Sequence, residues 1–225
     1  MGIGTLNENP LHAALKQWYA DPDDRLEAPL HGYVIDIVRQ DLLIEIQTGG
    51  FSPIARKLLT LLSTHRVRLV HPIAQNKWIL KLSEDDETIS RRKSPKRGRI
   101  HDIFAPLTAI PHLLLHPRFE LEVLLIDVEE IQRFDGKRGW RRKGWIVHER
   151  RLLAVNEEHR IDTPEASAQL LPPDLPVPFT TADLASHLQI HRRLAQQMAY
   201  CLRKMERIEI AGKSGNALCY TPSNK

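Results

Sequence analysis

The sequence predicts an α/β (α+β) fold with a small, separate module at its C-terminal end. Three observations lead to this prediction. Residues 1–85 interleave apolar, strand-like runs with stretches of helical spacing. Residues 162–178 contain five prolines and are expected to form a linker. Residues 179–225 then change to short helices followed by a hairpin, and the 225 residues of the chain suffice for one large core or two small ones.

The first elements are expected in the order helix, three strands, helix, strand. The expected segments are a helix over 10–20 with Asn9 as its N-cap, a hairpin over 33–48, a helix over 51–64 with Ser52 as its N-cap, and strands over 66–73 and 77–82. Residues 86–161 are expected to form a basic extension packed on this core, with a strand over 120–128 and one or two strands over 144–155. An independent domain in this segment is the alternative.

The hairpin carries one carboxylate in each apolar strand, Asp36 in the first and Glu45 in the second. A loop centred on residues 40–41 would place these two side chains directly opposite each other, with Cβ atoms about 5 Å apart. Like charges there destabilise a sheet unless a cation lies between them, and a hard divalent metal is the obvious candidate. The alternative is that both acids lie on an exposed face, but the apolar residues on both sides of the strands argue against it.

Asp36, eight intervening residues and the triplet Glu45-Ile46-Gln47 resemble the metal-binding core of the PD-(D/E)xK, or restriction endonuclease-like, nuclease superfamily. The expected αβββαβ order over residues 8–82 is similar to the core of that superfamily. Gln47 departs from the pattern, because Lys is usual at this position and Gln is found in a minority of restriction enzymes. The chain as a whole also resembles an uncharacterised bacterial family.

The resemblance implies a magnesium (or manganese) site that hydrolyses phosphodiester bonds. Three groups of the hairpin would bind the metal: the side chains of Asp36 and Glu45 and the backbone carbonyl of Ile46. Gln47 would orient the attacking water without supplying a charge. Lys57 would supply that charge, as in superfamily members whose catalytic lysine has moved to the following helix. The alternative is that Lys57 is an ordinary solvated lysine on the helix surface. Glu8 and Glu27 are the candidates for an additional acid.

Other hydrolytic or metal chemistries lack their motifs in this sequence. Cys201 and Cys219 are too far apart in sequence for a zinc ribbon, and no further ligand accompanies His112 and His116. No glycine-rich phosphate loop and no GxSxG nucleophile elbow occur. Metal-assisted hydrolysis by carboxylates is therefore the chemistry that the sequence favours.

Two basic runs predict a polyanionic partner, a nucleic acid that we expect to be DNA. Residues 90–99 hold six cations and no acid, at Arg91, Arg92, Lys93, Lys96, Arg97 and Arg99. Residues 137–143 hold five cations, with Arg141, Arg142 and Lys143 as the candidate contacts and with Trp140 and Trp145 placed to stack on bases. The alternative for both runs is a solvated, flexible loop.

Residues 179–225 resemble a winged helix-turn-helix module. Helices are expected over 182–188 and 192–205 and a hairpin over 207–220, with residues 165–171 as the candidate first helix. In such modules the second helix and the wing contact DNA, which here implies His191, Arg192, Arg193, Gln196, Gln197, Lys213 and Asn216. The alternative is that the module binds a protein partner or packs on the neighbouring domain.

These observations predict a metal-dependent nuclease that hydrolyses DNA and binds it through the winged helix and the basic runs. The alternative is a catalytically inactive nuclease-fold protein that binds DNA as an accessory or regulatory factor. A homodimer or a protein partner is compatible with either function. The sequence contains no apolar run of about 18 residues, so we expect a soluble, cytoplasmic protein without a membrane partner.

Overall fold

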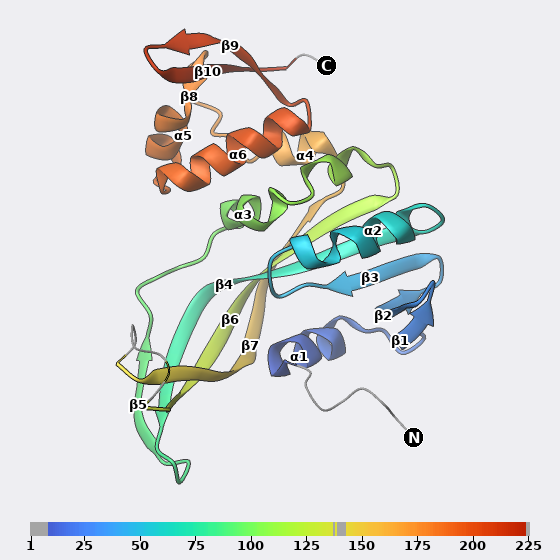
Figure 1. Cartoon of the computed structure of the whole chain (residues 1–225), viewed down its shortest axis with the longest axis vertical. Helices are drawn as coiled ribbons and strands as arrows, with labels where there is room; N and C mark the ends of the chain where they lie inside the picture. The colour runs from blue at the N-terminus through green and yellow to red at the C-terminus, as the bar shows by residue number, and fades with distance from the viewer. Residues whose placement is uncertain (1–8, 137, 139–142, 224–225) are drawn as a thin grey trace.

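The computed structural model describes residues 9–136, 138 and 143–223. It shows a mixed α+β protein built on a seven-stranded mixed sheet, with a smaller three-stranded sheet near the C-terminal end (Figure 1). The strands of the large sheet lie in the order β1-β2-β3-β4-β6-β7, and β5 pairs with β4. The predicted mixture of helices and strands is confirmed. None of the described helices is long and apolar enough to cross a membrane.

The N-terminal elements follow the expected order. They are α1 (Pro10–Tyr19), β1 (Arg25–Leu30), β2 (Tyr33–Arg39), β3 (Leu42–Ile46), a 3₁₀ turn over Ser52–Ile54, α2 (Ala55–Leu62) and β4 (Arg66–Leu82). Asn9 caps α1 as expected, since its side chain accepts a hydrogen bond of 3.1 Å from the backbone N–H of Leu11. The expectation that Ser52 caps the second helix is wrong, because Ser52 lies inside the 3₁₀ turn and neither the turn nor α2 has a side-chain cap.

β4 is one strand of 17 residues, where the sequence suggested two shorter strands. The interruption is a β-bulge, because the pairing between β4 and β6 (Phe119–Phe134) shifts between Ala74 and Asn76 and then continues. β3 pairs with the first part of β4, and β5 (Thr88–Lys93) pairs with its last part. Pro72 lies between them, where this edge of β4 has no strand partner among the described residues, so its missing N–H is tolerated.

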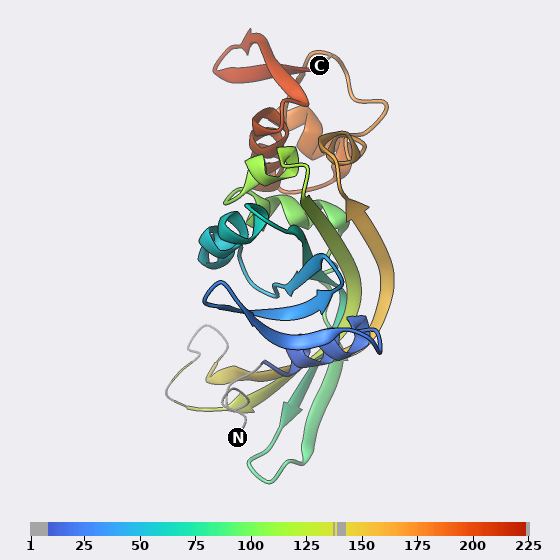
Figure 2. The same ribbon diagram turned by 90° about the vertical axis from the view of Figure 1, so that its right-hand side faces the viewer.

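Residues 86–161 extend the same sheet. β6 pairs with β4 in parallel along almost its whole length, and β7 (Trp145–Ile161) pairs with β6 in antiparallel. The three long strands curve together in Figure 2. The sheet therefore runs without a break from the expected core into the expected extension.

Apolar side chains bury the sheet on both faces. Leu11 of α1 belongs to one buried cluster with Ile44 and Ile46 of β3, whereas Leu58 of α2 belongs to another with Leu43. Because neighbouring residues of a strand point to opposite faces, both faces of β3 are covered. Short helical segments complete the second cluster, at Ile100–Ile103, Phe104–Leu107 (α3) and Pro111–Leu115. The hairpin that carries the two acids is therefore an interior part of the sheet.

Residues 94–99 connect β5 to these short helical segments and lie against β4; we call them the basic connector. The backbone N–H of Ser94 donates to the carbonyl of Lys77 at 2.7 Å, and the N–H of Gly98 donates to the carbonyl of Ala74 at 3.0 Å. A Cβ atom at Gly98 would lie 2.5 Å from that carbonyl oxygen and 2.6 Å from Cγ2 of Ile73. This close approach of the connector to β4 requires glycine.

The substitution Gly98→Ala is expected to lower the free energy of unfolding by about 1–3 kcal/mol, because the new methyl group overpacks a backbone contact. Urea unfolding of the variant and the wild type measures the difference. Gly50→Ala is the matched control, since a Cβ atom there meets nothing within 4 Å. Equal unfolding free energies for wild type and Gly98→Ala would contradict the close contact between connector and β4.

The C-terminal residues form short helices and the three-stranded sheet. The elements are α4 (Pro164–Ala168), β8 (Phe179–Thr180), α5 (Thr181–Leu188), α6 (Arg192–Lys204), β9 (Ile208–Ser214) and β10 (Ala217–Pro222), with the strand order β8-β10-β9. Thr180 and Asp183 form a capping box at the start of α5. The segment 162–178 is linker only in part, because α4 lies within it. α6 packs on α3, where the buried Sγ of Cys201 approaches the Phe104 carbonyl at 3.7 Å.

Candidate active site

The β2–β3 hairpin brings Asp36 and Glu45 together in the predicted register. The pairs between β2 and β3 end at Ile37 with Ile44, and Asp36 and Glu45 are the next residues beyond this last pair. At this point Oδ2 of Asp36 accepts a hydrogen bond of 2.8 Å from the backbone N–H of Ile46. The Asp36 carboxylate is thus held against the end of β3, next to Glu45.

α1 contributes a second partner of Asp36. Nε2 of His12 lies 3.2 Å from Oδ2 of Asp36. Burial favours the neutral acid, but the hydrogen bonds from His12 and from the Ile46 amide outweigh it and hold the pKa of Asp36 below its usual range. Asp36 is therefore a carboxylate at neutral pH. No motif in the sequence indicates His12, because its approach depends on how α1 packs across the sheet.

α2 places Lys57 beside Glu45. The next residue, Leu58, is fully buried against the sheet, so Lys57 lies where the helix meets the hairpin. Nζ of Lys57 lies 2.6 Å from Oε1 of Glu45 and donates to the backbone carbonyl of Val34 at 2.6 Å. The Lys57 side chain is 15% exposed and that of Glu45 is 7% exposed. We call Asp36, Glu45 and Lys57 the carboxylate–lysine cluster.

Glu45 is the member of this cluster that titrates near neutral pH. Burial has the largest effect on its carboxyl group and repulsion by Asp36 adds to it, whereas Lys57 opposes both. Together they raise the pKa of Glu45 from its ordinary value of 4.5 to about 7. Two neighbouring carboxyl groups whose pKa values are shifted in opposite directions are typical of functional sites.

Gln47 contacts the loop after β3 rather than the cluster. Its Nε2 donates to the backbone carbonyl of Gly50 at 2.8 Å, and its own backbone carbonyl lies 2.6 Å from Nδ1 of His71. Its backbone N–H donates to the carbonyl of Val70 at 2.9 Å. Lys57 is therefore the predicted site residue that the structure brings to Glu45, and Gln47 holds the adjoining loop.

Of the two candidates for an additional acid, only Glu27 lies in the described residues. Leu26 pairs with Ile37 and Ala28 pairs with Ile35. The register of β1 and β2 therefore sets Glu27 opposite Asp36. Its carboxylate, however, lies 2.6 Å from Nζ of Lys16 in α1. Glu27 is therefore engaged by a lysine, and Glu8 lies outside the described residues.

The cluster offers two carboxylates and an incompletely paired oxygen to a metal ion. Oε1 of Glu45 contacts Lys57 without regular hydrogen-bond geometry. Mg²⁺ usually binds through one or two carboxylates and completes its octahedron with water and substrate phosphate. Within the part of the chain that the structure describes, no three His, Cys, Asp or Glu side chains are grouped to hold a metal.

The first basic run lies partly on a strand rather than wholly in a flexible loop. Arg91, Arg92 and Lys93 belong to β5, and Nε of Arg91 lies 2.7 Å from Oε1 of Glu129. Arg91 and Lys93 also lie over the Trp78 ring, 5.7 and 5.1 Å from its centroid. The remaining candidates of this run belong to the basic connector: Lys96, Arg97 and Arg99. In the second run Lys143 is exposed, and two candidates lie outside the described residues: Arg141 and Arg142.

The C-terminal candidates lie mainly on the exposed face of α6. Arg192, Arg193 and Gln196 are exposed in its first half, and Gln197 is half-buried. The opposite face of the helix is buried against its neighbours. Lys213 is exposed in β9. The structure thus leaves these polar side chains accessible to a partner.

The fold and the site define a mixed α+β protein with a carboxylate pair, buried Glu45 and half-buried Asp36, at the end of a β-hairpin. This chain belongs to the family DUF8091, described as a domain of unknown function, whose model matches residues 9–162. A protein of Treponema pallidum (strain Nichols), described as an uncharacterized protein, is 34% identical over 186 residues, which cover 82% of this chain and 74% of that protein. No solved structure matches the chain.

Proposed function

We propose that this protein is a metal-dependent nuclease that hydrolyses phosphodiester bonds in DNA at the carboxylate–lysine cluster. The observation that carries the proposal is the pair of half-buried Asp36 and buried Glu45, held together at the end of the hairpin with Lys57 beside them. Buried charges are stable only when they are paired or bind a cation. Lys57 pairs with Glu45, and the Ile46 amide and His12 hold Asp36; a divalent ion would supply the further positive charge that offsets the repulsion between the two carboxylates.

The order of the elements supports the proposal. The series α1-β1-β2-β3-α2-β4 is the αβββαβ order of the restriction endonuclease-like superfamily that the sequence resembles. At the other end of the chain, α4, β8, α5, α6, β9 and β10 follow the order of a winged helix-turn-helix module in which α6 is the recognition helix. A nuclease domain joined to a DNA-binding module is a coherent arrangement for a DNA-processing protein.

Each member of the cluster has its own role in the proposed reaction. When bound, a divalent ion would activate water and neutralise phosphate charge. Asp36 and Glu45 would hold that ion, with the backbone carbonyl of Ile46 as a further ligand. Lys57 would keep its positive charge beside the scissile phosphate, where negative charge grows as water attacks phosphorus and the P–O bond to the leaving oxygen breaks. His12 would keep Asp36 oriented and ionised.

Metal affinity is expected to rise with pH. The ion requires Glu45 as a carboxylate, and a pKa of about 7 leaves Glu45 mostly protonated in weakly acidic solution. The Kd for Mn²⁺ should therefore weaken by up to about tenfold for each pH unit below 7 and become level above it. Calorimetric titration across this range measures the effect. An equally steep pH dependence in the Glu45→Gln variant would show that another group is responsible.

Cleavage assays test the proposed function itself. Purified protein is incubated with plasmid, single-stranded and branched DNA in the presence of Mg²⁺ or Mn²⁺, and in parallel with EDTA. The proposal expects metal-dependent cleavage of at least one of these substrates. It is rejected if no substrate is cleaved with either metal, or if the Asp36→Ala and Glu45→Ala variants cleave as fast as the wild type.

A second candidate function is that of a catalytically inactive, DNA-binding accessory or regulatory protein. It is favoured by the ion pair of Lys57 with Glu45 and by Gln47 at the position where the superfamily usually has lysine. Binding of DNA without any calorimetric signal for Mn²⁺ would support it. If the winged helix instead binds a protein partner or a second copy, we expect little affinity for DNA even at low salt. If it contacts DNA phosphates, we expect an affinity for DNA that falls steeply as the salt concentration rises. Either function agrees with the cytoplasmic location that the sequence predicts.

A further inference from the structure

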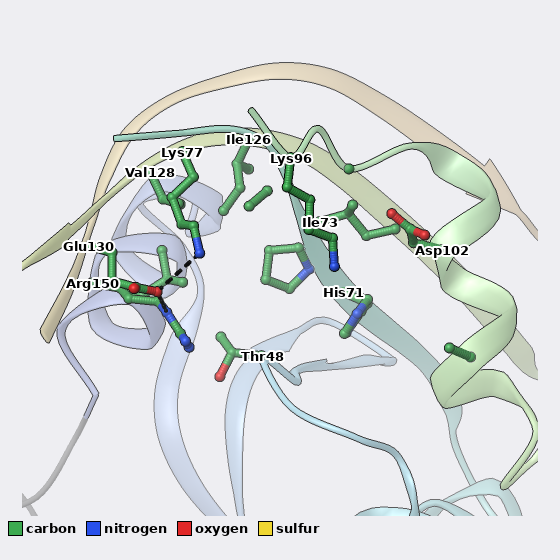
Figure 3. Close-up of a pocket in the computed structure, with 15 residues that line it drawn as sticks. Thr48, His71, Ile73, Lys77, Lys96, Asp102, Ile126, Val128, Glu130 and Arg150 are labelled. Atoms are coloured by element: carbon green, nitrogen blue, oxygen red, sulfur yellow. Dashed lines mark hydrogen bonds and ion pairs between the residues drawn. The ribbon is translucent and has the colours of Figure 1, made fainter. Parts of the chain in front are cut away.

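A pocket of about 390 Å³ lies beside the residue that follows the β2–β3 hairpin segment, with Thr48 and Leu11 in its wall. Figure 3 shows Thr48 and His71 at one side of it and Lys77 and Lys96 directed into it from the other. Thr48 directly follows Gln47 at the end of the hairpin, and Leu11, also in the wall, directly precedes the histidine that holds Asp36. The pocket lies at the stretch of the β4 edge between β3 and β5, which has no strand partner among the described residues and where the basic connector lies. It therefore borders the segments that carry the proposed site, with Thr48 after the hairpin and Leu11 before His12.

The pocket combines an apolar wall with a basic rim. Side chains of β4 and β6 form the apolar part, among them Ile73, Ile126 and Val128. On the rim, Lys77 and Arg150 each lie 3.3 Å from Oε2 of Glu130, whose side chain is only 2% exposed (Figure 3). This shared carboxylate holds the two cations in place. An apolar surface bordered by fixed cations suits a ligand with a flat ring and a phosphate.

The pocket is the middle part of a longer groove. Lys96, Asp102 and Ala105 also line a second depression of about 850 Å³, whose other side is the start of α6 with His191 and Arg193. At the opposite end, two residues of the pocket also line a third depression of about 360 Å³ beside β5: Lys77 and Glu130. Because each depression shares residues with the next, they follow one another from α6 to β5.

The charge of this groove is strongly positive. Among the described residues that line its three parts, nine are Lys or Arg and two are carboxylates, Asp102 and Glu130. The cations come from the basic connector, the long strands, β5, α6 and the turn before β7, which are distant in sequence. The fold therefore gathers the separate basic segments into one track that includes the pocket beside Thr48. A track of this kind matches the phosphate backbone of a nucleic acid.

We propose that this groove binds one DNA strand in single-stranded form and leads it to the carboxylate–lysine cluster. The proposal rests on the nuclease function proposed above and adds the form of its substrate. A pocket of about 390 Å³ has the size of a small-ligand site and so admits one nucleotide. A base that is paired and stacked inside a duplex cannot enter such a pocket, whereas an unpaired base can lie on its apolar wall with its phosphate at the rim.

Two substitutions test the groove by different means. Ala105→Trp fills the junction of the first two depressions without changing the charge, and Lys96→Glu reverses one charge at the same junction. The matched control is Arg25→Glu, the same kind of charge reversal at an exposed residue of the edge strand β1. Fluorescence anisotropy in EDTA measures the affinity of each protein for a single-stranded oligonucleotide and for its duplex. Thermal unfolding checks that all variants are folded.

The wild type is expected to bind the single strand more tightly than the duplex. Ala105→Trp should raise the Kd for the single strand at least about tenfold and leave its salt dependence unchanged, whereas Lys96→Glu should also lower the salt slope by about one. Arg25→Glu should stay within about twofold of the wild type. Tighter binding of the duplex, or wild-type affinity in a folded Ala105→Trp protein, overturns the proposal.

A small substrate separates this proposal from the nuclease function. Bis(p-nitrophenyl) phosphate is a diester without bases or further phosphates, so its hydrolysis with Mn²⁺ by the wild type and by Arg25→Glu, which lies outside the groove, tests the cluster independently of strand binding. If the wild type hydrolyses neither this diester nor DNA but shows the expected pattern of strand binding, the nuclease function fails and the strand-binding groove stands. If the diester is hydrolysed but the groove variants bind and cleave single strands like the wild type, the groove proposal alone fails.

Discussion

The Lys57→Ala variant is expected to cleave DNA about 10²–10³ times more slowly than the wild type, the loss typical for one charged group that stabilises a transition state. Lys57 is the cation nearest to the acid pair, with Nζ 2.6 Å from Oε1 of Glu45. In the PD-(D/E)xK pattern the corresponding charge belongs to the position of Gln47, which here carries none and bonds to Gly50. Removal of Lys57 therefore removes a charge that can replace the missing lysine.

Two control variants separate catalysis from stability in this experiment. Arg56→Ala removes the neighbouring exposed cation of α2 and should leave the rate within about twofold. Gln47→Ala disturbs only the loop bond to Gly50 and should slow cleavage much less than Lys57→Ala. Steady-state cleavage rates of the four proteins at saturating Mn²⁺ make the comparison. If Gln47→Ala loses more activity than Lys57→Ala, the catalytic residue is Gln47, at the position of the superfamily motif, and not Lys57.

The wild-type protein is expected to lose stability as the pH rises from about 4.5 to 7 because of Glu45. In the folded state its pKa is raised to about 7, so the folded protein keeps a proton that the unfolded chain releases at lower pH. The stabilising effect of this proton is fully present below the unfolded pKa and is lost as the pH rises through the folded pKa. At about 1.4 kcal/mol for each unit of pKa, the loss amounts to about 3 kcal/mol.

The Glu45→Gln variant isolates this effect from the other titrating groups. Free energies of unfolding are measured by urea titration in EDTA at about pH 5 and pH 8 for both proteins. The decrease between the two pH values should be larger in the wild type than in Glu45→Gln by about 2–3 kcal/mol. Parallel pH profiles of the two proteins would show that Glu45 ionises normally and that the acid pair is not under electrostatic strain.

The position of the two acids could be predicted from the sequence because it depends on local geometry. Once the turn at residues 40–41 is assigned, alternation along β2 and β3 determines that Asp36 lies opposite Glu45. Apolar residues on both sides of each strand likewise indicated that the hairpin is buried. These features require only the spacing of residues that are near each other in the chain.

The partners of the acids depend on tertiary packing and could not be derived in the same way. His12 reaches Asp36 from α1, and the ion pair of Lys57 with Glu45 requires α2 to lie at a particular height above the hairpin. The sequence proposed Lys57 only through the superfamily resemblance and did not indicate His12. The sequence also did not indicate that the Gln47 side chain binds the Gly50 carbonyl of the next loop. Side chains alternate between the two faces within a strand, but this alternation does not continue after the strand ends.

The groove likewise could not be predicted from the sequence, because it depends on packing between distant segments. The basic runs were evident from composition, but their assembly with α6 depends on the connector lying against β4, where Gly98 permits the contact. The prediction of two separate strands at 66–82 also missed the stretch of the β4 edge between β3 and β5 that the connector covers, which exists because β4 continues through its bulge. Sequence patterns identified the parts, and long-range strand pairing determined where they meet.

The most direct test of the central claim, that Asp36 and Glu45 form a metal-dependent phosphodiesterase site, is the rate of DNA cleavage in Mn²⁺ by the wild type and by Asp36→Asn. This substitution keeps the size of the side chain and removes its charge. The expected result is cleavage by the wild type that EDTA abolishes and a rate at least about 10³-fold lower in the variant. Equal rates for the two folded proteins, or no cleavage by the wild type, would contradict the claim.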